Sequence, residues 1–461
     1  GHRVVTPGVC IAASASGTGK TTIATGLMAA LARTHTVAPF KVGPDYIDPG
    51  YHALAAGRAG RNLDSVMCGT SLLGPLYAHG SQGADIGVVE GVMGLFDGRI
   101  TDQVYTDYAP GSTAEVAATL GLPVVLVVDV RGMSQSVGAA VKGFATAADG
   151  VRVAGVILNK VGTSRHEAVC RSAVELQGIP VLGALPRVDK VEVPSRHLGL
   201  VTAAEHGSAA MQAVERMADL VAKHVDLDVV RGLASCSYAG SAWDPAAVVQ
   251  RVPGDPVVAV AGGPAFTFAY AEHAEVLEAT GAKVVHFDPL RDPLPPCDGL
   301  IIPGGFPEEH VEDLSSRHDL QDAVRAHVAA GKPVHGECAG LLWLLESLDA
   351  YPMLGVIDTH AAMGRRLTLG YRDAVALTDS VLFRAGERIT GHEFHHTALT
   401  SQEVAGWESA WGWRAWDGRA VREGFSRGNI HASYMHCHPA SLPQAVERFV
   451  RACVDARTSA S

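Results

Sequence analysis

The sequence has few charged and few aromatic residues, and it has no excess of basic residues. Charged residues make up 18% of the 461 positions and aromatic residues 6%, while 47% are hydrophobic. The formal net charge is −11, which argues against a nucleic-acid partner because such a partner requires basic surface. With this apolar content the chain can bury large cores, and its length suits two or three domains.

Long apolar runs and paired cysteines are also missing. No apolar run approaches the length of a membrane span, and no secretory signal opens the chain. The eight cysteines are scattered, and none belongs to a Cys-x-x-Cys pair. We therefore expect a reduced, cytoplasmic protein without a membrane partner, rather than a disulfide or zinc framework. The sequence does not decide between a monomer and a homodimer.

A glycine-rich turn near the start of the chain predicts an ATP site. Residues 13–22 follow a short apolar run and precede a helical pattern, which is the context of a phosphate-binding loop. Backbone N–H groups and the helix N-terminus can surround a phosphate, Lys20 can reach the outer phosphates, and Thr21 can bind Mg²⁺. The predicted contacts are Ser16, Gly17, Thr18, Gly19, Lys20, Thr21 and Thr22. Ser14 stands where the full motif has glycine, so a Gly/Ser turn before an ordinary helix is the alternative.

Short β-branched runs alternate with helical patterns through the first half of the chain. This alternation predicts a mostly parallel sheet with helices on both faces, where ligands bind beyond the carboxyl ends of the strands. A second alternation begins at Val257, whereas residues 226–256 have none. We therefore predict an α/β protein with one domain at 1–225, a linker at 226–256 and a second domain at 257–461.

Polar residues follow several of the predicted strands in the first domain. Asp45 and Asp48 lie in a loop where they could hold Mg²⁺ or only cap turns. Glu90 ends a strand that reads as buried, where a carboxylate requires a nearby cation such as a metal. Asn159 could hydrogen-bond a purine or cap the next helix, and Asp97 lies in a glycine-rich loop with a less definite role.

Two arginines in later loops are candidates for binding a polyanionic substrate. Arg187 follows the run that ends at Leu185, and Arg196 lies between Val193 and Leu200. Isolated cationic side chains are most often solvated surface, so that interpretation has equal weight.

The decisive stretch of the second half is His335–Leu342. Cys338 lies between small residues, after a predicted strand and before a helix, which resembles a nucleophile elbow. The helix N-terminus would favour a thiolate, although a lone cysteine is more often buried and structural. The turn at 302–306 and the residue after the nucleophile offer oxyanion donors at Gly305 and Ala339, and His436 offers a base. The histidines of 391–396 have no helical metal spacing, so we expect a structural or substrate-contact role.

A phosphate loop and a Cys/His elbow on one chain resemble a known family, the glutamine-dependent cobyrinic or hydrogenobyrinic acid a,c-diamide synthases of cobalamin biosynthesis. The resemblance covers nearly the whole chain and is most specific at 39–49, 90–98, 196–200, 336–340 and 391–395. It implies an N-terminal P-loop domain similar to dethiobiotin synthetase, with a doubly wound, mostly parallel sheet. It also implies a C-terminal domain similar to class I glutamine amidotransferases.

The resemblance also implies roles for individual residues. Lys20 and Thr21 would bind the triphosphate and Mg²⁺, with Asp45 and Glu90 at the acidic metal positions. Cys338 would be the nucleophile and His436 the base. Many class I glutaminases have Glu two residues after this His, whereas this chain has His438. Candidate substrate contacts are Lys41, Tyr46, Asp48, Asp97, Arg187 and Arg196.

The activity implied by the resemblance is amidation of the a and c acetates of a corrin ring through an acyl-phosphate, with ATP, Mg²⁺ and ammonia from glutamine. A cobyric acid synthase, which amidates other side chains of the ring, is the nearest alternative. A partitioning-type P-loop ATPase is another, but it leaves Cys338 and His436 without a role.

Overall fold

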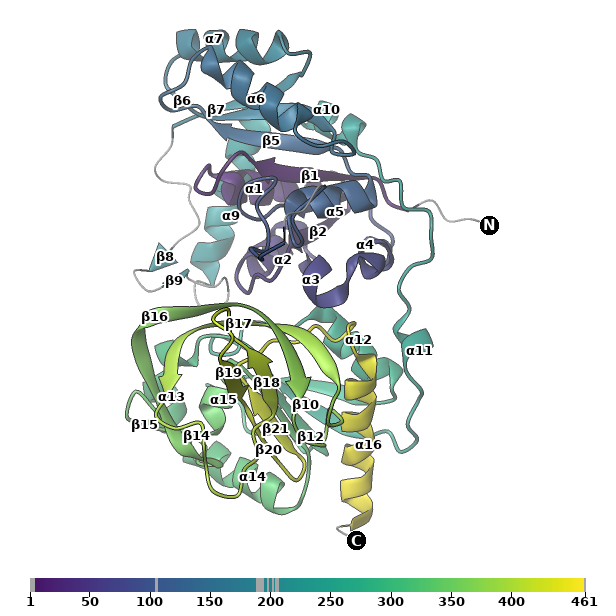
Figure 1. The fold of residues 1–461 in the computed structure, drawn as a ribbon, viewed down its shortest axis with the longest axis vertical. Helices are drawn as coiled ribbons and strands as arrows, with labels where there is room; N and C mark the ends of the chain where they lie inside the picture. Colours follow the sequence, from purple (N-terminus) through teal and green to yellow (C-terminus); the bar gives the residue numbers. More distant parts are fainter. Residues whose placement is uncertain are drawn as a thin grey trace. The chain divides into compact units, whose positions relative to one another are not determined.

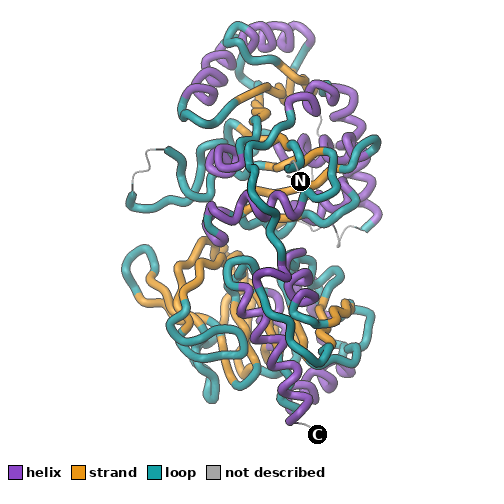
Figure 2. The backbone as a smooth tube through the Cα atoms, turned by 90° about the vertical axis from the view of Figure 1, so that its right-hand side faces the viewer, coloured by secondary structure: helices purple, strands orange, loops and turns teal. Residues whose placement is uncertain are grey.

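The computed structural model describes residues 5–103, 107–187, 203 and 207–459, together with the backbone of 195–196 and 199–200. The chain divides into two compact units, Gly1–Trp243 and Asp244–Ser461, and each has its own sheets and helices (Figure 1, Figure 2). Both units combine helices with mostly parallel central strands, which confirms the predicted α/β class. Among the described helices, none has the length and apolarity that crossing a bilayer requires.

The described part of the first unit is built on a seven-stranded sheet in the order β3-β2-β4-β1-β5-β6-β7, and its neighbouring strands are parallel. Most of these strands are buried along their length, as expected of a parallel sheet covered on both faces. The strands are β1 Gly8–Ala13, β2 Val37–Val42, β3 Arg61–Leu63, β4 Ile86–Glu90, β5 Val124–Asp129, β6 Val153–Val161 and β7 Val181–Pro186. The short pair β8 Ser195–Arg196 and β9 Gly199–Leu200 is antiparallel.

Helices connect these strands and lie on both faces of the sheet (Figure 1). They are α1 Lys20–Ala32, α2 Asp48–Ala56, α3 Ser65–Cys68, α4 Leu73–Gly80, α5 Thr113–Leu120, α6 Ser136–Thr146, α7 Ser164–Glu175, α9 Ser208–His224 and α10 Leu227–Leu233, with a 3₁₀ turn η1 at Thr70–Leu72. The strand order reverses at β1, between β4 and β5. The loops after β1, β2 and β4 therefore open at the sheet edge where ligands of such folds bind.

The stretch predicted as a linker is divided between the two units. Residues 226–243 belong to the first unit, and Ser235 exchanges two backbone hydrogen bonds with Gly8 at the start of β1. Residues from Asp244 onward belong to the second unit. Strand–helix alternation did not reveal this, because the segment contains only the short helix α10 and is otherwise irregular, without periodicity.

The second unit contains two sheets. The central sheet has the order β11-β10-β12-β13-β21-β20, and it is parallel except for β20. Its strands are β10 Val257–Ala261, β11 Lys283–Phe287, β12 Gly299–Ile302, β13 Val334–Glu337, β20 Phe425–Arg427 and β21 Ile430–Ser433. The other sheet joins β14 Leu345–Leu348, β15 Tyr351–Pro352, β16 Ile357–Ala376, β17 Arg388–Leu399, β18 Trp411–Arg414 and β19 Ala420–Glu423. The antiparallel pair β16–β17 confirms the alternating pattern of that region.

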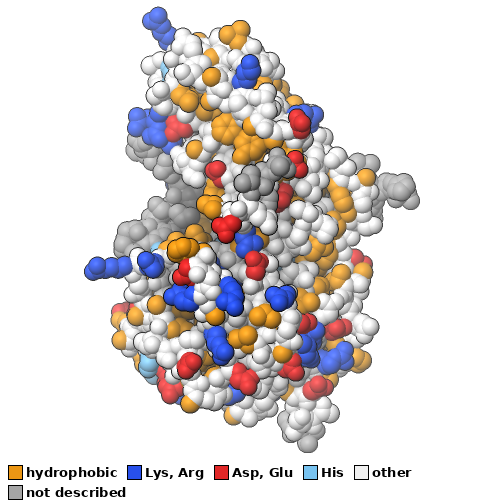
Figure 3. Space-filling view, viewed as in Figure 1, with side chains coloured by type: hydrophobic (Ala, Val, Ile, Leu, Met, Phe, Trp, Pro, Cys, Tyr) orange, Lys and Arg blue, Asp and Glu red, His pale blue; other side chains and the backbone are white. Residues whose placement is uncertain are grey.

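Helices of the second unit cover its central sheet. They are α11 Pro245–Val248, α12 Ala271–Ala279, α13 Val311–Ser315, α14 His318–Ala329, α15 Ala339–Leu344 and α16 Pro443–Ser459, with a 3₁₀ turn η2 at Pro307–Glu309. The short helix α15 is buried along its whole length, and its side chains, including Trp343, belong to the hydrophobic core. On the face that Figure 3 shows, acidic and basic side chains are interspersed, so neither charge dominates that surface.

Gly26 allows α1 and α9 to approach each other closely. A Cβ atom at Gly26 would lie 2.5 Å from the carbonyl oxygen of Met217 and 2.7 Å from Cγ2 of Val221, both on α9. Gly143, on an exposed part of α6, has nothing within 4 Å of the same position. The two glycines therefore form a matched pair in which only one is required by packing.

We predict that Gly26→Ala will lower the free energy of opening α1 by about 1–3 kcal/mol, because the added methyl group overpacks the contact with α9. Gly143→Ala should leave α6 unchanged or stabilise it by up to about 1 kcal/mol. Native-state hydrogen exchange of peptides from each helix measures both effects. Equal protection of α1 in the wild type and in Gly26→Ala would contradict the prediction, because it would show that the α1–α9 contact accommodates the methyl group without a loss of stability.

Candidate active sites

The turn between β1 and α1 has the backbone geometry of a phosphate loop. Gly17 and Gly19 have φ values of 77° and 87°, which glycine adopts without strain, and α1 begins at Lys20. An open hollow of about 720 Å³, within the range of ligand sites, is lined by Ser16, Gly17 and Thr18 on one side. Its other side is lined by Asp129, Arg131, Gly132 and Met133, which the sequence analysis had not singled out.

Asn159 supports the phosphate loop. Its side-chain amide donates a hydrogen bond of 2.8 Å to the carbonyl oxygen of Thr18, and a Cβ at Gly19 would lie 2.4 Å from that amide nitrogen. The next helix, α7, is capped by Thr163, so the interpretation of Asn159 as a helix cap is wrong. A contact between Asn159 and a purine stays a prediction.

A buried lysine joins the carboxylates at the ends of β2 and β4. Lys41 and Glu90 are paired in register on these parallel strands, and Lys41 Nζ lies 2.5 Å from Glu90 Oε2. The same ammonium group lies 2.9 Å from Asp48 Oδ2 and 3.9 Å from Asp45 Oδ2. The sequence analysis expected a cation such as a metal beside Glu90. The structure shows that Lys41 of the protein itself provides a cation there.

Two further side chains contact Glu90. Thr21 donates a hydrogen bond of 3.0 Å from its hydroxyl to Oε2, and His52 Nε2 lies 2.8 Å from Oε1. The sequence analysis missed His52, which is fully buried on α2. The sequence could have indicated His52 through its spacing of four residues from Asp48, since residues i and i+4 lie on one face of a helix.

Burial and neighbouring charges shift the pKa values of this cluster. Burial raises the pKa of Asp48, and the negative charges of Asp45 and Glu90 raise it further. Burial alone would also raise the pKa of Glu90, but Lys41 and His52 hold it well below the usual value. Burial, reinforced by Lys41, lowers the pKa of Lys20 to about 8. The cluster thus places three carboxyl groups around the ammonium group of Lys41.

Asp45 has one of the two roles that the sequence analysis considered, since it caps a turn. Its Oδ1 accepts hydrogen bonds of 2.9 and 2.7 Å from the backbone N–H groups of Ile47 and Asp48, so it caps the turn that starts α2. Its side chain remains about a quarter exposed, and its other oxygen faces Lys41. Capping therefore uses one oxygen and leaves the other beside the cluster.

The remaining substrate candidates of this unit differ in their exposure. Asp97 is exposed and accepts a hydrogen bond of 2.9 Å from the backbone N–H of Gly94, so it closes its own loop. Tyr46 is buried, whereas Arg187 is exposed. The side chain of Arg196 lies outside the described residues.

Cys338 occupies a sharp turn between β13 and α15. Its φ of 53° and ψ of −99° are strained for a residue other than glycine, and such strain is common at functional sites. Its backbone N–H donates a hydrogen bond of 2.7 Å to the carbonyl of Ser433 on β21. At Gly340 a Cβ would lie 2.0 Å from the carbonyl oxygen of Ile302, so only glycine fits there. The structure thus has the predicted elbow.

The expected thiolate is not favoured in this state. Burial raises the pKa of Cys338 well above the usual value, and the nearby carboxylates of Glu308 and Glu337 raise it further. The backbone N–H of Ala339 hydrogen-bonds to the sulfur and opposes this effect, but it does not outweigh it. The reason is that α15 offers one N–H group, whereas burial removes the hydration that a thiolate requires.

The predicted oxyanion donors lie on two elements. Ala339 follows Cys338 at the start of α15, and Gly305 lies in the turn after β12 with a φ of 154°. A Cβ at Gly305 would lie 2.3 Å from the carbonyl oxygen of Ala265, so glycine is required. The neighbouring Gly304 approaches His436, since a Cβ there would lie 2.9 Å from Cε1 of the ring. The turn and the predicted base are therefore neighbours.

His436 is held by its backbone and lies against a carboxylate. It exchanges backbone hydrogen bonds of 2.7 and 2.9 Å with His392 on β17, and its Nδ1 lies 3.3 Å from Oε1 of Glu337. His438 Nε2 instead lies 3.9 Å from Oε2 of Glu272 on α12. The sequence analysis missed Glu337, although it directly precedes Cys338.

The histidine-rich stretch 391–396 forms part of β17 and makes structural contacts. Glu393 accepts a hydrogen bond of 3.0 Å from Arg372 and lies 2.7 Å from His395 Nε2. The His395 ring stacks on Tyr434 with 3.6 Å between the ring centres. These contacts join β16, β17 and the loop after β21, and the carbonyl of Phe394 lies 3.6 Å from the sulfur of Cys338.

Two family models match the chain, one in each unit. Residues 9–201 match the CobQ/CobB/MinD/ParA nucleotide binding domain, and residues 257–443 match the CobB/CobQ-like glutamine amidotransferase domain. The first match contains the phosphate loop and the Lys41–Glu90 cluster. The second contains the Cys338 elbow and His436.

Curated relatives are similar over nearly the whole length. A hydrogenobyrinate a,c-diamide synthase of Mycobacterium tuberculosis is 55% identical, covering 96% of this chain and 97% of the relative. A protein of the same name from Streptomyces coelicolor is 51% identical, covering 97% of each. A cobyrinate a,c-diamide synthase of Picrophilus torridus is 37% identical, covering 96% of this chain and 98% of the relative.

We predict that Cys338 will react slowly with iodoacetamide at neutral pH, because burial and neighbouring carboxylates keep the thiol protonated. The rate of a free thiol levels off above about pH 8.5, whereas the rate of Cys338 should still be rising there. Glu308→Gln should accelerate the reaction at neutral pH by removing a negative charge, while Glu278→Gln on the exposed side of α12 serves as the control. Peptide mass mapping follows Cys338 separately from the other cysteines. The profile of an unperturbed thiol in the wild type would contradict the prediction.

Proposed function

We propose that this chain converts the a and c acetate carboxylates of hydrogenobyrinate into amides with ATP and glutamine. The reason is that the chain belongs to the family of hydrogenobyrinate and cobyrinate a,c-diamide synthases. The observation that carries this proposal is a phosphate loop beside an acidic cluster in one unit and a strained cysteine near a histidine in the other. Activation of a carboxylate and release of ammonia require these two sets of groups.

Hydrogenobyrinate is the preferred substrate in this proposal. The relatives from Mycobacterium tuberculosis and Streptomyces coelicolor, at 55% and 51% identity, are named for hydrogenobyrinate. The relative from Picrophilus torridus, at 37% identity, is named for cobyrinate. Similarity therefore favours a ring without cobalt, and comparing the two rings as substrates tests this choice.

The second unit would release ammonia from glutamine. Cys338 attacks the side-chain amide carbon after its proton passes to His436, and the developing oxyanion is met by the N–H groups of Gly305 and Ala339. His436 then donates the proton to the leaving nitrogen, so ammonia departs and a thioester remains. Water hydrolyses the thioester and releases glutamate.

The first unit would activate the ring carboxylate. A carboxylate oxygen is a poor leaving group, and its phosphorylation converts it into phosphate, which departs readily when ammonia attacks. The loop at 16–22 would hold the triphosphate, with Lys20 at the outer phosphates and Asn159 supporting the loop. Arg187, which is exposed, is our candidate for binding other carboxylates of the ring, together with Arg196.

In this proposal Mg²⁺ binds beside the acidic cluster. The oxygen atoms of Thr21 and Glu90 are 3.0 Å apart, close to the spacing of neighbouring ligands around an octahedral ion at about 2.1 Å. Within the described residues, no group of three or more His, Cys, Asp and Glu side chains is arranged to hold a metal alone. Mg²⁺ at this place would take most of its ligands from phosphate and water. Bound between Thr21, Glu90 and Asp45, Mg²⁺ would neutralise the transferring phosphoryl group.

Two other activities have less support. A cobyric acid synthase would use the same groups on other carboxylates of the ring, and product analysis separates the two reactions. A partitioning-type ATPase would need the phosphate loop alone, and it would leave the strain at Cys338 without a purpose. A glutaminase assay separates this activity from the proposed one.

We predict that Cys338→Ser will abolish glutamine-dependent amidation and retain amidation with added ammonia. The reason is that Cys338 only supplies ammonia, while ATP acts in the other unit. Product mass after incubation with ATP, Mg²⁺, the ring and either nitrogen donor measures both reactions. Equal loss with glutamine and with ammonia would contradict the assignment of two separate sites.

We predict that Glu90→Gln and Asp45→Asn will lower amidation with ammonia by about 10²- to 10³-fold, the usual effect of losing one group that stabilises charge in a transition state. Glutamine hydrolysis should persist, because Cys338 lies in the other unit. Removing Glu90 also leaves Lys41 without its closest partner, which costs about 3–5 kcal/mol in a buried pair.

Asp45→Asn is therefore the cleaner variant, since this side chain is partly exposed. Amidation at the wild-type rate across a Mg²⁺ titration would exclude that carboxylate as a metal ligand. Thermal unfolding of both variants separates a lost ligand from a lost fold.

A further inference from the structure

The predicted base, His436, requires a group that sets the orientation of its ring. In many class I glutaminases this group is a Glu two residues further on, where this chain has His438. The contacts of His438 lead elsewhere: its Nδ1 accepts a hydrogen bond of 3.1 Å from the N–H of Ala440, and its ring lies 4.4 Å from that of Tyr270. Its Nε2 faces Glu272 at 3.9 Å. His438 is thus engaged with α12 and the loop that precedes it.

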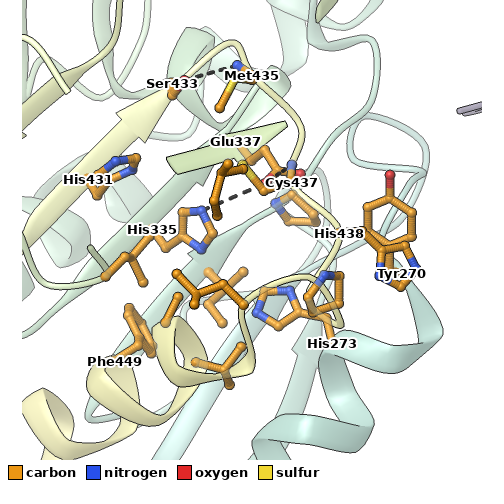
Figure 4. A pocket seen from close by; sticks show the side chains of 18 of the residues that line it. Tyr270, His273, His335, Glu337, His431, Ser433, Met435, Cys437, His438 and Phe449 are labelled. Atoms are coloured by element: carbon orange, nitrogen blue, oxygen red, sulfur yellow. Dashed lines mark hydrogen bonds and ion pairs between the residues drawn. The ribbon is translucent and has the colours of Figure 1, made fainter. Parts of the chain in front are cut away.

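Glu337 lies where such an orienting group would act. Its Oε1 is 3.3 Å from Nδ1 of His436, and its Oε2 is 3.4 Å from the backbone nitrogen of Cys437 and 3.8 Å from Nε2 of His335. The distance to His436 is slightly long for a hydrogen bond, as is common in active sites before substrate binds. Figure 4 shows Glu337 beside His335 and Cys437, in a cavity of about 50 Å³ that also contacts His273 and His438.

The backbone holds Glu337 and the two reacting groups in a constant arrangement. Glu337 pairs in register with Ser433, whose carbonyl accepts the N–H of Cys338 at 2.7 Å. Three residues after Ser433, His436 is held by its two backbone hydrogen bonds to His392. Glu337 therefore directly precedes the nucleophile Cys338 in the chain. A short loop joins Ser433, which is hydrogen-bonded to Cys338, to the base His436.

The charges around Glu337 are consistent with an orienting role. Burial alone would raise the pKa of Glu337, but hydrogen bonding and attraction to His436, with smaller effects of His335 and His273, hold it below the usual value. Burial lowers the pKa of His335 to about 3 and also lowers that of His273, so both rings are neutral near pH 7. Cys437 stays a neutral thiol, because burial raises its pKa. Of the neighbouring imidazoles, His436 therefore has the largest effect on this carboxylate.

We infer that Glu337 is the positioning residue of the glutaminase site, in place of the carboxylate that many class I glutaminases have after the histidine. It accepts the Nδ1–H of His436, which places the ring lone pair on Nε2, and Nε2 takes the proton of Cys338 as sulfur bonds to the amide carbon. The imidazolium is stabilised by the carboxylate until Nε2 returns the proton to the departing ammonia. This inference rests on the proposed glutamine hydrolysis at Cys338.

The test compares Glu337→Gln and Glu337→Asp with Glu272→Gln, which removes the charge beside His438. Glu337→Gln should lower kcat for glutamine hydrolysis by about 10²- to 10⁴-fold with little change in KM, the range expected for impaired acid–base catalysis. The acidic limb of the kcat/KM profile should move to lower pH, because the imidazolium loses its stabilising negative charge. Glu337→Asp should recover part of the rate, and Glu272→Gln should leave the profile unchanged.

Three further measurements keep the outcomes distinct. Retained amidation with ammonia shows that the first unit of Glu337→Gln is intact, and a wild-type thermal unfolding transition of the second unit shows that this unit is folded. Cys338→Ser shows whether hydrolysis depends on the cysteine at all. Loss of hydrolysis in Cys338→Ser with a normal rate and pH profile in Glu337→Gln would overturn the role of Glu337 and leave the proposed function intact. A shifted profile in Glu272→Gln alone would assign the orienting role to His438. Full hydrolysis in Cys338→Ser would overturn the proposed function itself.

Discussion

Parallel pairing of strands in register is the constraint on which both candidate sites depend. In the first unit it brings Lys41 of β2 beside Glu90 of β4, at the edge where the loop after β1 begins. In the second unit it brings Glu337 of β13 beside Ser433 of β21, at the edge where Cys338 and His436 follow. Because carboxyl ends of parallel strands meet at one edge, residues distant in sequence become neighbours there.

Both sites carry a cost in stability that their surroundings offset. Lys41, Asp48 and Glu90 are buried ionisable groups, and such groups are tolerated only when they are paired. Cys338 has a strained backbone that the packing of α15 and the close contact at Gly340 maintain. In each unit the surrounding core is apolar and closely packed, so it can hold an arrangement that would be unfavourable by itself.

The sequence was most informative where chemistry is local. The phosphate loop at 16–22, the elbow at Cys338 and the strand runs from Val37 and Val257 all follow from residues near one another in the chain. Asn159 and Glu90 were recognised as functional positions, but their partners Thr18 and Lys41 were not assigned to them. His52 and Glu337 were missed, because each acts through a neighbour that only folding brings close.

By itself, the sequence determined the α/β class, the nucleotide loop, the nucleophile candidate and the family resemblance. These depend on motif spacing and on periodicity, which the chain carries in linear order. Only the tertiary structure decided that Lys41 neutralises Glu90, that Asn159 supports the phosphate loop, and that the thiol of Cys338 is protonated before substrate binds. These depend on burial and on distances between strands, because desolvation and Coulomb attraction are set by three-dimensional neighbours rather than by sequence neighbours.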